Sequence, residues 1–466
     1  MTENTVSIRT KLAILATGLL SFIGILVETS LNVTFPTMMV QFHTSLSTVQ
    51  WLTSGYLLMV TIVMSTTAFL IKHYHTRTLF RVAIIATLLG TILSATAPSF
   101  LILMIGRILQ AVATGLSTPL MFHVILSLIP QSRLGVYMGI ASMITSFAPA
   151  LGPTYGGLLN FYFNWRMIFI ITLPLIIIIG IIGEYSIRLQ TPRSEERFDL
   201  KGLILLSLVF FGFIETFDQA GNTGFISLNF GLTFLITIGF LLVLLHHIQK
   251  GSRQILNFKI FTDPIISLRA INFFLLQFIN IGISFVIPVF AQNYLGADSM
   301  ISGLILLPGS LIGAIVAPVA GSIYDRRGPE ITLYIANGSM MIGSLLLWWL
   351  TKSLNLFGIT LLYIFLRFGF NFGFGNIMSD ASQRVSLTER ADLNSLFNTL
   401  QQYAGSIGTG VLSAIISVET LHISAAKNGL ATASGSKNDF LLLGIFSLVG
   451  LVTTSTVSRI QRHKKV

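Results

Sequence analysis

The sequence has no cysteine, which excludes disulfide bonds, thiol chemistry and cysteine metal sites. Charged residues are also scarce, at 10% of the 466 residues, whereas about a quarter is usual for a soluble domain. No GxxxxGKS/T phosphate-binding loop is present, and no group of His, Asp and Glu has the spacing of a metal site. These absences argue against an enzyme, an ATPase, a cofactor or a bound metal.

The abundant residues point to a membrane. Hydrophobic residues make up 53% of the chain, and the mean hydropathy is +0.82. A helix needs about 20 mostly apolar residues to cross a bilayer. Segments of this kind lie at 12–35, 48–71, 79–97, 100–127, 134–159, 166–187, 201–218, 227–248, 265–292, 300–323, 331–350, 356–380, 395–418 and 440–458. The pattern predicts an all-α membrane protein with about 14 transmembrane helices and both termini on the same side.

The basic residues are distributed unevenly between the two alternating sets of loops on this plan. Loops on the side of the termini hold most of the Lys and Arg behind the net charge of +11, and the opposite loops hold only Arg166, Lys352, Lys427 and Lys437. Because cytoplasmic loops are enriched in Lys and Arg, we expect both termini in the cytoplasm of a bacterial cell and the chain in its plasma membrane. The basic residues then face the lipid bilayer rather than a nucleic acid.

Two longer polar connections divide the chain. Residues 191–201 carry mixed charges, and residues 250–263 are basic. Two apolar segments lie between these connections and form a separate pair. We therefore expect an N-terminal six-helix bundle at 1–190, a two-helix insert with cytoplasmic linkers at 191–262, and a C-terminal six-helix bundle at 263–466.

A short internal repeat supports this division. Leu101–Gly115 reads LILMIGRILQAVATG and Leu361–Gly375 reads LLYIFLRFGFNFGFG, so Arg107 and Arg367 each lie eight residues before a glycine. Each arginine belongs to the fourth segment of its half. Two similar halves are a plan of secondary transporters, which bind the substrate between the halves near mid-membrane. An arginine at membrane depth is costly and is therefore a candidate functional residue.

Several short motifs in the sequence fit the motifs of one known family. Residues 152–157 (GPTYGG) fit a GPxxGG motif, and 107–115 fit an RxxQG-type motif with alanine in place of one glycine. Residues 164–174 fit WRxIFxINxP, and 321–328 fit GxLxDRxG. With these motifs the chain resembles the major facilitator superfamily, in particular its 14-helix drug:proton antiporters, over nearly its whole length.

The resemblance implies roles for two sets of residues. It makes Gly152, Pro153, Gly156 and Gly157 a conformational motif, and it places Asp325, Arg326 and Gly328 in a signature cytoplasmic loop. Gly152 and Gly156 also form a small-xxx-small pair, which permits close helix contact. Ordinary close packing would use the same residues, and the sequence does not separate the two interpretations.

The chain departs from the family pattern in two places. The first-half copy of the signature loop has Lys72 at the Asp position and His75 at the Gly position. In the first apolar segment Val27 occupies the family's Asp position, and a carboxylate follows one residue later at Glu28. A shift of one residue turns a side chain by about 100° around a helix, so the family's role does not transfer directly to Glu28.

Glu28, Asn32, Arg107 and Gln110 are the candidate site for proton coupling and substrate. A carboxyl group at membrane depth can take up and release a proton or pair with a cationic substrate. Arg107 is expected to modulate it, with Gln110 one turn along as its hydrogen-bond partner. The alternatives are a structural or surface-directed Glu28 and a packing role for Arg107. Arg367 and Asn371 are the second-half pseudo-equivalents.

Three other charged sites have simpler interpretations. We expect Asp380 and Arg384 to form a structural ion pair across one helical turn. Arg269 is expected to reach the lipid headgroups. Asp218, near the end of the first insert segment, is expected to be solvated.

The sequence therefore predicts a monomeric, proton-coupled secondary transporter that exports lipophilic or cationic drugs by alternating access. Its partners are a small amphipathic substrate, protons and the lipid bilayer, with no cofactor. One alternative is a carrier of the same fold for a lipid, a metabolite or an anionic compound. A non-transporting receptor or scaffold is disfavoured by the antiporter-type glycines and by the lack of a sizeable extramembrane domain.

Overall fold

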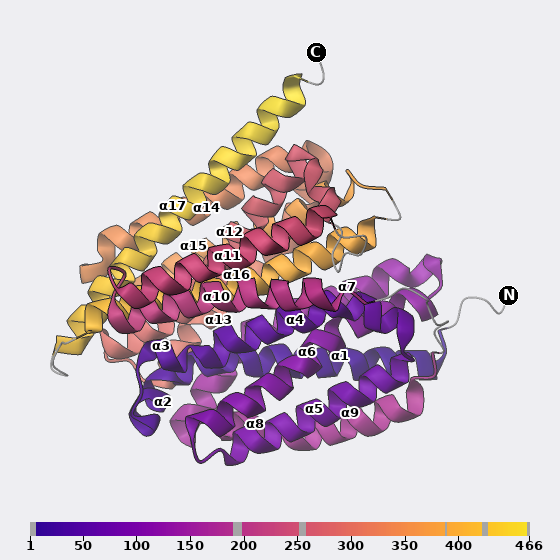
Figure 1. Ribbon diagram of the computed structural model, residues 1–466, viewed down its shortest axis with the longest axis horizontal. Helices are drawn as coiled ribbons and strands as arrows, with labels where there is room; N and C mark the ends of the chain where they lie inside the picture. The colour runs from indigo at the N-terminus through magenta and orange to yellow at the C-terminus, as the bar shows by residue number, and fades with distance from the viewer. Residues whose placement is uncertain (1–5, 190–197, 251–257, 387–388, 422–426, 464–466) are drawn as a thin grey trace.

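The computed structural model describes residues 6–189, 198–250, 258–386, 389–421 and 427–463, and in these ranges it contains helices and no strand (Figure 1). Parts of both predicted polar connections, 190–197 and 251–257, lie outside the described residues. The helices are α1 (Ile8–Ser30), η1 (Leu31–Thr34), α2 (Phe35–Phe42), α3 (Leu46–Val49), α4 (Trp51–His73), α5 (Thr76–Thr96), α6 (Phe100–Leu128), α7 (Gln131–Tyr162), α8 (Met167–Ile170), α9 (Thr172–Ser186), α10 (Leu200–Thr223), α11 (Leu228–Lys250), η2 (Phe258–Thr262), α12 (Pro264–Asn293), α13 (Ser299–Arg327), α14 (Pro329–Leu350), η3 (Thr351–Ser353), α15 (Leu356–Ser382), α16 (Arg390–Thr420) and α17 (Asn428–His463).

Local sequence explains where several helices begin. The side chains of Asp263, Asp298 and Asn355 each precede a helix and accept a backbone N–H from its first turn, at 2.7, 2.7 and 2.8 Å. Such capping satisfies donors that have no partner within the helix. Every predicted apolar segment overlaps a helix or two consecutive helices, and 12 helices of the described chain are long and apolar enough to cross a membrane.

The first and last of these helices differ from the predicted segments. The apolar run from α1 is interrupted by η1 and continues as α2, with Pro36 in the first turn of α2. α17 begins at Asn428, well before the predicted segment at 440. This early part is rich in Ala, Ser, Thr and Gly, which lowers its hydropathy but allows close packing: a Cβ on Gly435 would lie 2.6 Å from the Ile416 Cα in α16.

The helices from α1 to α9 lie mostly in the lower part of Figure 1, and α12 to α17 lie mostly in the upper part. The two groups meet where α7 packs on α13 and where α4 packs on α16. These two helix pairs form the main contacts between the first and the last third of the chain.

The helices α10 and α11 form a hairpin across this seam (Figure 1). α10 packs against α4 and α16 through aromatic pairs: the Phe210 ring stacks on Tyr403 (3.9 Å between centroids) and Phe211 contacts Trp51 (5.7 Å). Asp218 of α10 is only 9% exposed and accepts a hydrogen bond from Asn222 Nδ2 (3.0 Å). The expectation of a solvated Asp218 is therefore wrong, because α10 packs on the bundle up to its end.

Candidate functional site

One side of α1 and η1 carries the polar residues of the candidate site. Gly24, Glu28 and Asn32 follow at intervals of four residues and therefore share this side. Two donors from α4 reach it: the Tyr56 hydroxyl donates to the Gly24 carbonyl (3.2 Å), and Thr53 Oγ1 donates to Asn32 Oδ1 (2.8 Å). Glu28 lies between these two contacts along the chain and is 6% exposed. Its carboxyl group is therefore inside the helix bundle.

Arg107 of α6 is completely buried. Its Nε donates to the Leu52 carbonyl of α4 (3.2 Å), and its Nη1 donates to Gln110 Oε1 (3.0 Å). Gln110 Nε2 in turn donates to Thr91 Oγ1 of α5 (2.9 Å), and the guanidinium lies over the Tyr56 ring at 3.9 Å. The contact expected between Arg107 and Gln110 is therefore present. The second amino group, Nη2, is buried and has no acceptor among the described residues.

Glu28 and Arg107 are buried in the same part of the bundle. Tyr56 contacts both the Arg107 guanidinium and the segment of α1 that carries Glu28. In the described part of the chain Glu28 nevertheless forms no salt bridge. A buried carboxyl group that no cation holds in its ionised form can exchange a proton or accept an external cation. The Tyr56 ring lies under the Arg107 guanidinium, and its hydroxyl donates to the Gly24 carbonyl one turn before Glu28, so this residue connects Arg107 with α1.

The contacts of the second-half pseudo-equivalents differ from those of the first half. Arg367 Nη1 of α15 donates to Asn280 Oδ1 of α12, whereas Asn371 Nδ2 donates to the backbone carbonyl of Arg367 (2.9 Å). The two halves are therefore similar in sequence here, but Arg367 and Asn371 do not form a side-chain contact like that of Arg107 and Gln110. The reason is that an Asn four residues on reaches back along its own helix, whereas a Gln three residues on reaches the guanidinium.

An ion pair fixes α12 to α15 elsewhere in the second half. Arg269 Nε donates to Asp380 Oδ2 at 2.6 Å, and both side chains are buried. The predicted pair of Asp380 with Arg384 is also present, at 3.4 Å. Arg269 does not reach outward as expected, because Asp380 on the neighbouring helix offers it a partner inside the protein.

The glycines of the 152–157 motif provide close contacts in two directions. A Cβ on Gly156 would lie 2.1 Å from the Ser30 carbonyl oxygen on α1, and one on Gly157 would lie 2.4 Å from the Ser299 carbonyl oxygen on α13. A Cβ on Gly303 of α13 would likewise lie 2.3 Å from the Pro153 carbonyl oxygen on α7. Helix α7 is therefore in direct backbone contact with α1 on one side and with α13 on the other.

The GxLxDRxG stretch forms the end of α13 rather than a loop. Asp325 and Arg326 lie in its last turn and are exposed, and Gly328 follows it with a φ of 78°. Residues with side chains rarely adopt this left-handed conformation, which explains the glycine at this place in the motif.

Sequence reasoning missed the residues of α4 and α5 at the site. Thr53, Tyr56 and Thr91 are ordinary members of apolar segments, and no motif marks them. A weak signal was available, because Thr53 and Tyr56 are three residues apart and so share one side of a helix. Which helix this side faces depends on packing between helices, and a single sequence does not show it.

The fold and the site narrow the class of protein. The described chain is a multi-helix membrane protein with a buried carboxyl group, a buried arginine and close backbone contacts between its two parts, which are features of small-molecule transporters. The family model of the Major Facilitator Superfamily matches residues 17–409. The chain belongs to the Major Facilitator Superfamily.

Individual similarities agree with this family. Lincomycin resistance protein LmrB of Bacillus subtilis (strain 168) is 30% identical over 462 residues, which cover 95% of each chain. The riboflavin transporter RibZ of Clostridioides difficile (strain 630) is 25% identical over 69% of each chain. Among solved structures, an inward-facing, occupied bacterial homologue of the human lysosomal transporter Spinster has a TM-score of 0.67 at 13% identity and covers 96% of both chains.

Proposed function

We propose that this protein is a proton-coupled exporter of lipophilic or cationic drugs and that Glu28 carries the coupled proton. The observation that carries the proposal is the buried Glu28 carboxyl group, which has no salt bridge in the described chain. The drug-resistance name of the relative LmrB supports a drug as the substrate. Asn32, Gln110 and the residues of α4 would hold the two groups in position.

The proposed topology has 14 transmembrane helices. The 32-residue α7 and the 31-residue α16 are each long enough to span a bilayer, which requires about 20 residues. With the 12 apolar helices they give two six-helix bundles around the insert α10–α11, with boundaries near 190 and 262. The basic loops support a cytoplasmic position for both termini. We further propose that the monomer is the transporting unit, because each part of the site comes from one chain.

The contacts between the two bundles support alternating access. Four hydrogen bonds join them in the described chain: Gln292 to the Val33 carbonyl, Ser406 to the Ser54 carbonyl, Ser299 to the Gly157 carbonyl, and Thr154 to the Gly303 carbonyl, at 2.6 to 3.4 Å. On the proposed topology, three of them lie near the outer ends of their helices, and the Ser406–Ser54 bond lies deeper, near the middle of α16. This conformation is therefore closed on the outside, which is the arrangement expected of an inward-facing state.

The proposed cycle follows from these positions. In the inward-facing state, a cationic substrate binds from the cytoplasm and displaces the proton of Glu28. Separation of α7 from α13 then opens the outer side, the substrate leaves, and Glu28 takes up a proton from outside. Arg107 assists the release of the proton, because a nearby positive charge stabilises a carboxylate. The proton gradient thus drives the return of the empty transporter.

A carrier for an anionic compound is the second candidate. The unpaired Nη2 of Arg107 favours it, because a buried guanidinium donor can bind a carboxylate or phosphate of a substrate. The name of the relative RibZ also shows a transporter of a non-drug compound among similar proteins.

An efflux panel in a pump-deficient host, with lincomycin, lipophilic cations and riboflavin, separates the candidates. Cation efflux abolished by a protonophore supports the exporter, whereas riboflavin movement alone supports the second candidate.

Replacing Arg107 with lysine is expected to lower transport about tenfold although the positive charge is kept. Lysine lacks the planar fork that lets Arg107 donate to Leu52 and Gln110 together while lying over Tyr56. The initial transport rate in proteoliposomes measures this effect. The matched control is Arg367→Lys, which is expected to have a smaller effect. Equal rates for wild type and Arg107→Lys would show that only the charge matters.

A further inference from the structure

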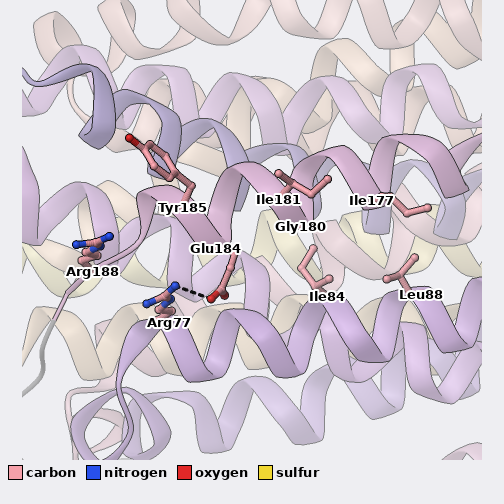
Figure 2. Close-up of a pocket in the computed structure, with 9 residues that line it drawn as sticks. All are labelled: Arg77, Ile84, Leu88, Ile177, Gly180, Ile181, Glu184, Tyr185 and Arg188. Atoms are coloured by element: carbon pink, nitrogen blue, oxygen red, sulfur yellow. Dashed lines mark hydrogen bonds and ion pairs between the residues drawn. The ribbon is translucent and has the colours of Figure 1, made fainter.

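A groove of about 550 Å³ runs between α5 and α9, away from the candidate site (Figure 2). Ile84 and Leu88 of α5 form one wall, and Ile177 and Ile181 of α9 form the other. Ile177 and Ile181 are 51% and 67% exposed, so this wall faces the surroundings of the protein. Gly180 deepens the groove between the walls, because a Cβ there would lie 3.2 Å from the Ile84 side chain.

One end of this groove is basic. Glu184 of α9 accepts hydrogen bonds from Arg77 Nη2 (2.5 Å) and from Arg81 Nε (2.8 Å), both from α5. Arg188 lies at the same end and is exposed (Figure 2). Arg77 and Arg81 thus share the Glu184 carboxylate, and Arg188 has no ion pair in the described chain, which leaves an excess of positive charge at this end. In addition, the Nε donor of Arg77 is buried and has no acceptor among the described residues.

We propose that this groove binds an anionic phospholipid of the inner leaflet. The phosphate would bind Arg188 beside the partly exposed side chains of Arg77 and Arg81, and an acyl chain would lie along the apolar walls. The combination favours a lipid over a soluble anion, because a soluble anion would leave the apolar length of the groove empty. It favours an anionic over a zwitterionic headgroup, since basic pockets between membrane helices on the cytoplasmic side select anionic lipids. The assignment rests on the proposed topology, which places the basic end at the cytoplasmic surface.

The test is a titration of the purified, delipidated full-length protein in detergent, followed by native mass spectrometry. Phosphatidylglycerol and phosphatidylcholine with identical acyl chains serve as the two probes. We expect the wild type to bind phosphatidylglycerol more tightly than phosphatidylcholine. Arg188→Gln should weaken the binding of phosphatidylglycerol about fivefold. It should weaken the binding of phosphatidylcholine less, because the choline group already offsets the charge of that lipid's phosphate. Arg188 has no ion pair in the described chain, so this variant should fold normally.

Two controls make the result specific. Arg459→Gln removes an exposed positive charge near the end of α17, remote from the groove, and should leave both lipids unaffected. Glycerol phosphate, which has the headgroup chemistry without acyl chains, should fail to displace the bound lipid. Equal affinity for the two lipids, an equal loss in Arg459→Gln, or displacement by glycerol phosphate would each overturn the proposal. Because the assay measures binding without transport, it remains informative if the proposed export activity is wrong.

Discussion

Replacing Glu28 with glutamine is expected to abolish export driven by a proton gradient. Glutamine is nearly isosteric with a protonated glutamic acid, so the buried environment between α1 and α4 should be preserved. It has no proton to release, however, and no charge to pair with a cationic substrate. Uptake into inside-out proteoliposomes under an imposed pH gradient should therefore fall by about tenfold or more, which is the usual size of an energetic coupling between two ligands.

Two companion variants define the cause of this loss. Glu28→Asp keeps an ionisable group and should retain part of the coupled uptake. Glu419→Gln makes the same chemical change in α16, far along the chain from the site, and should transport like the wild type. If Glu28→Gln still responds to the pH gradient, Glu28 is not the coupling group, and the proton must be carried elsewhere.

Replacing Gly157 with alanine is expected to open the outer side of the transporter. The new Cβ would lie 2.4 Å from the Ser299 carbonyl oxygen, and backbone atoms of two helices cannot move aside cheaply. Overpacking of this kind costs about 1–3 kcal/mol. The cost applies only while α7 and α13 are in contact, so it should shift the population toward the outward-open state and slow export.

The absence of cysteine makes this shift measurable. Ser406 is buried at the seam and donates to the Ser54 carbonyl (2.6 Å), so a single Ser406→Cys variant carries one thiol that is hidden while the outer side is closed. A membrane-impermeant thiol reagent added outside should label it about tenfold faster in the Gly157→Ala background.

Gly156→Ala is the matched comparison, since it faces α1 within the same bundle and should lower thermal stability without the same increase in labelling. Gly239→Ala, whose added Cβ meets nothing within 4 Å, should change neither. A labelling rate in Gly157→Ala equal to that in Gly239→Ala would contradict the proposed outer seal.

Much of the fold could be predicted because the membrane simplifies the relation between sequence and structure. In lipid, backbone groups must be paired within the segment, so each long apolar run forms a helix. The prediction was poorest where helices pack with small residues, as at the start of α17. There Gly435 fits against Ile416, and this packing is not visible as hydrophobicity.

The candidate site was predictable only where its contacts are local. The Arg107–Gln110 hydrogen bond follows from a spacing of three residues along one helix. The position of Tyr56 over Arg107 and the pairing of Arg269 with Asp380 involve residues far apart in the sequence. Such contacts depend on how the helices are rotated and placed. For the same reason the sequence could show that Arg107 needs a partner but not that Glu28 would lie near it.

The role proposed for Glu28 is tested most directly by substrate-induced proton release. Purified protein in weakly buffered detergent solution, at a pH where Glu28 is protonated in the free transporter, is mixed with a substrate found in the efflux panel, and the released protons are followed with a pH indicator. The proposed mechanism predicts proton release by the wild type and by Glu419→Gln, and none by Glu28→Gln at substrate concentrations that saturate binding. Undiminished proton release by Glu28→Gln would contradict it.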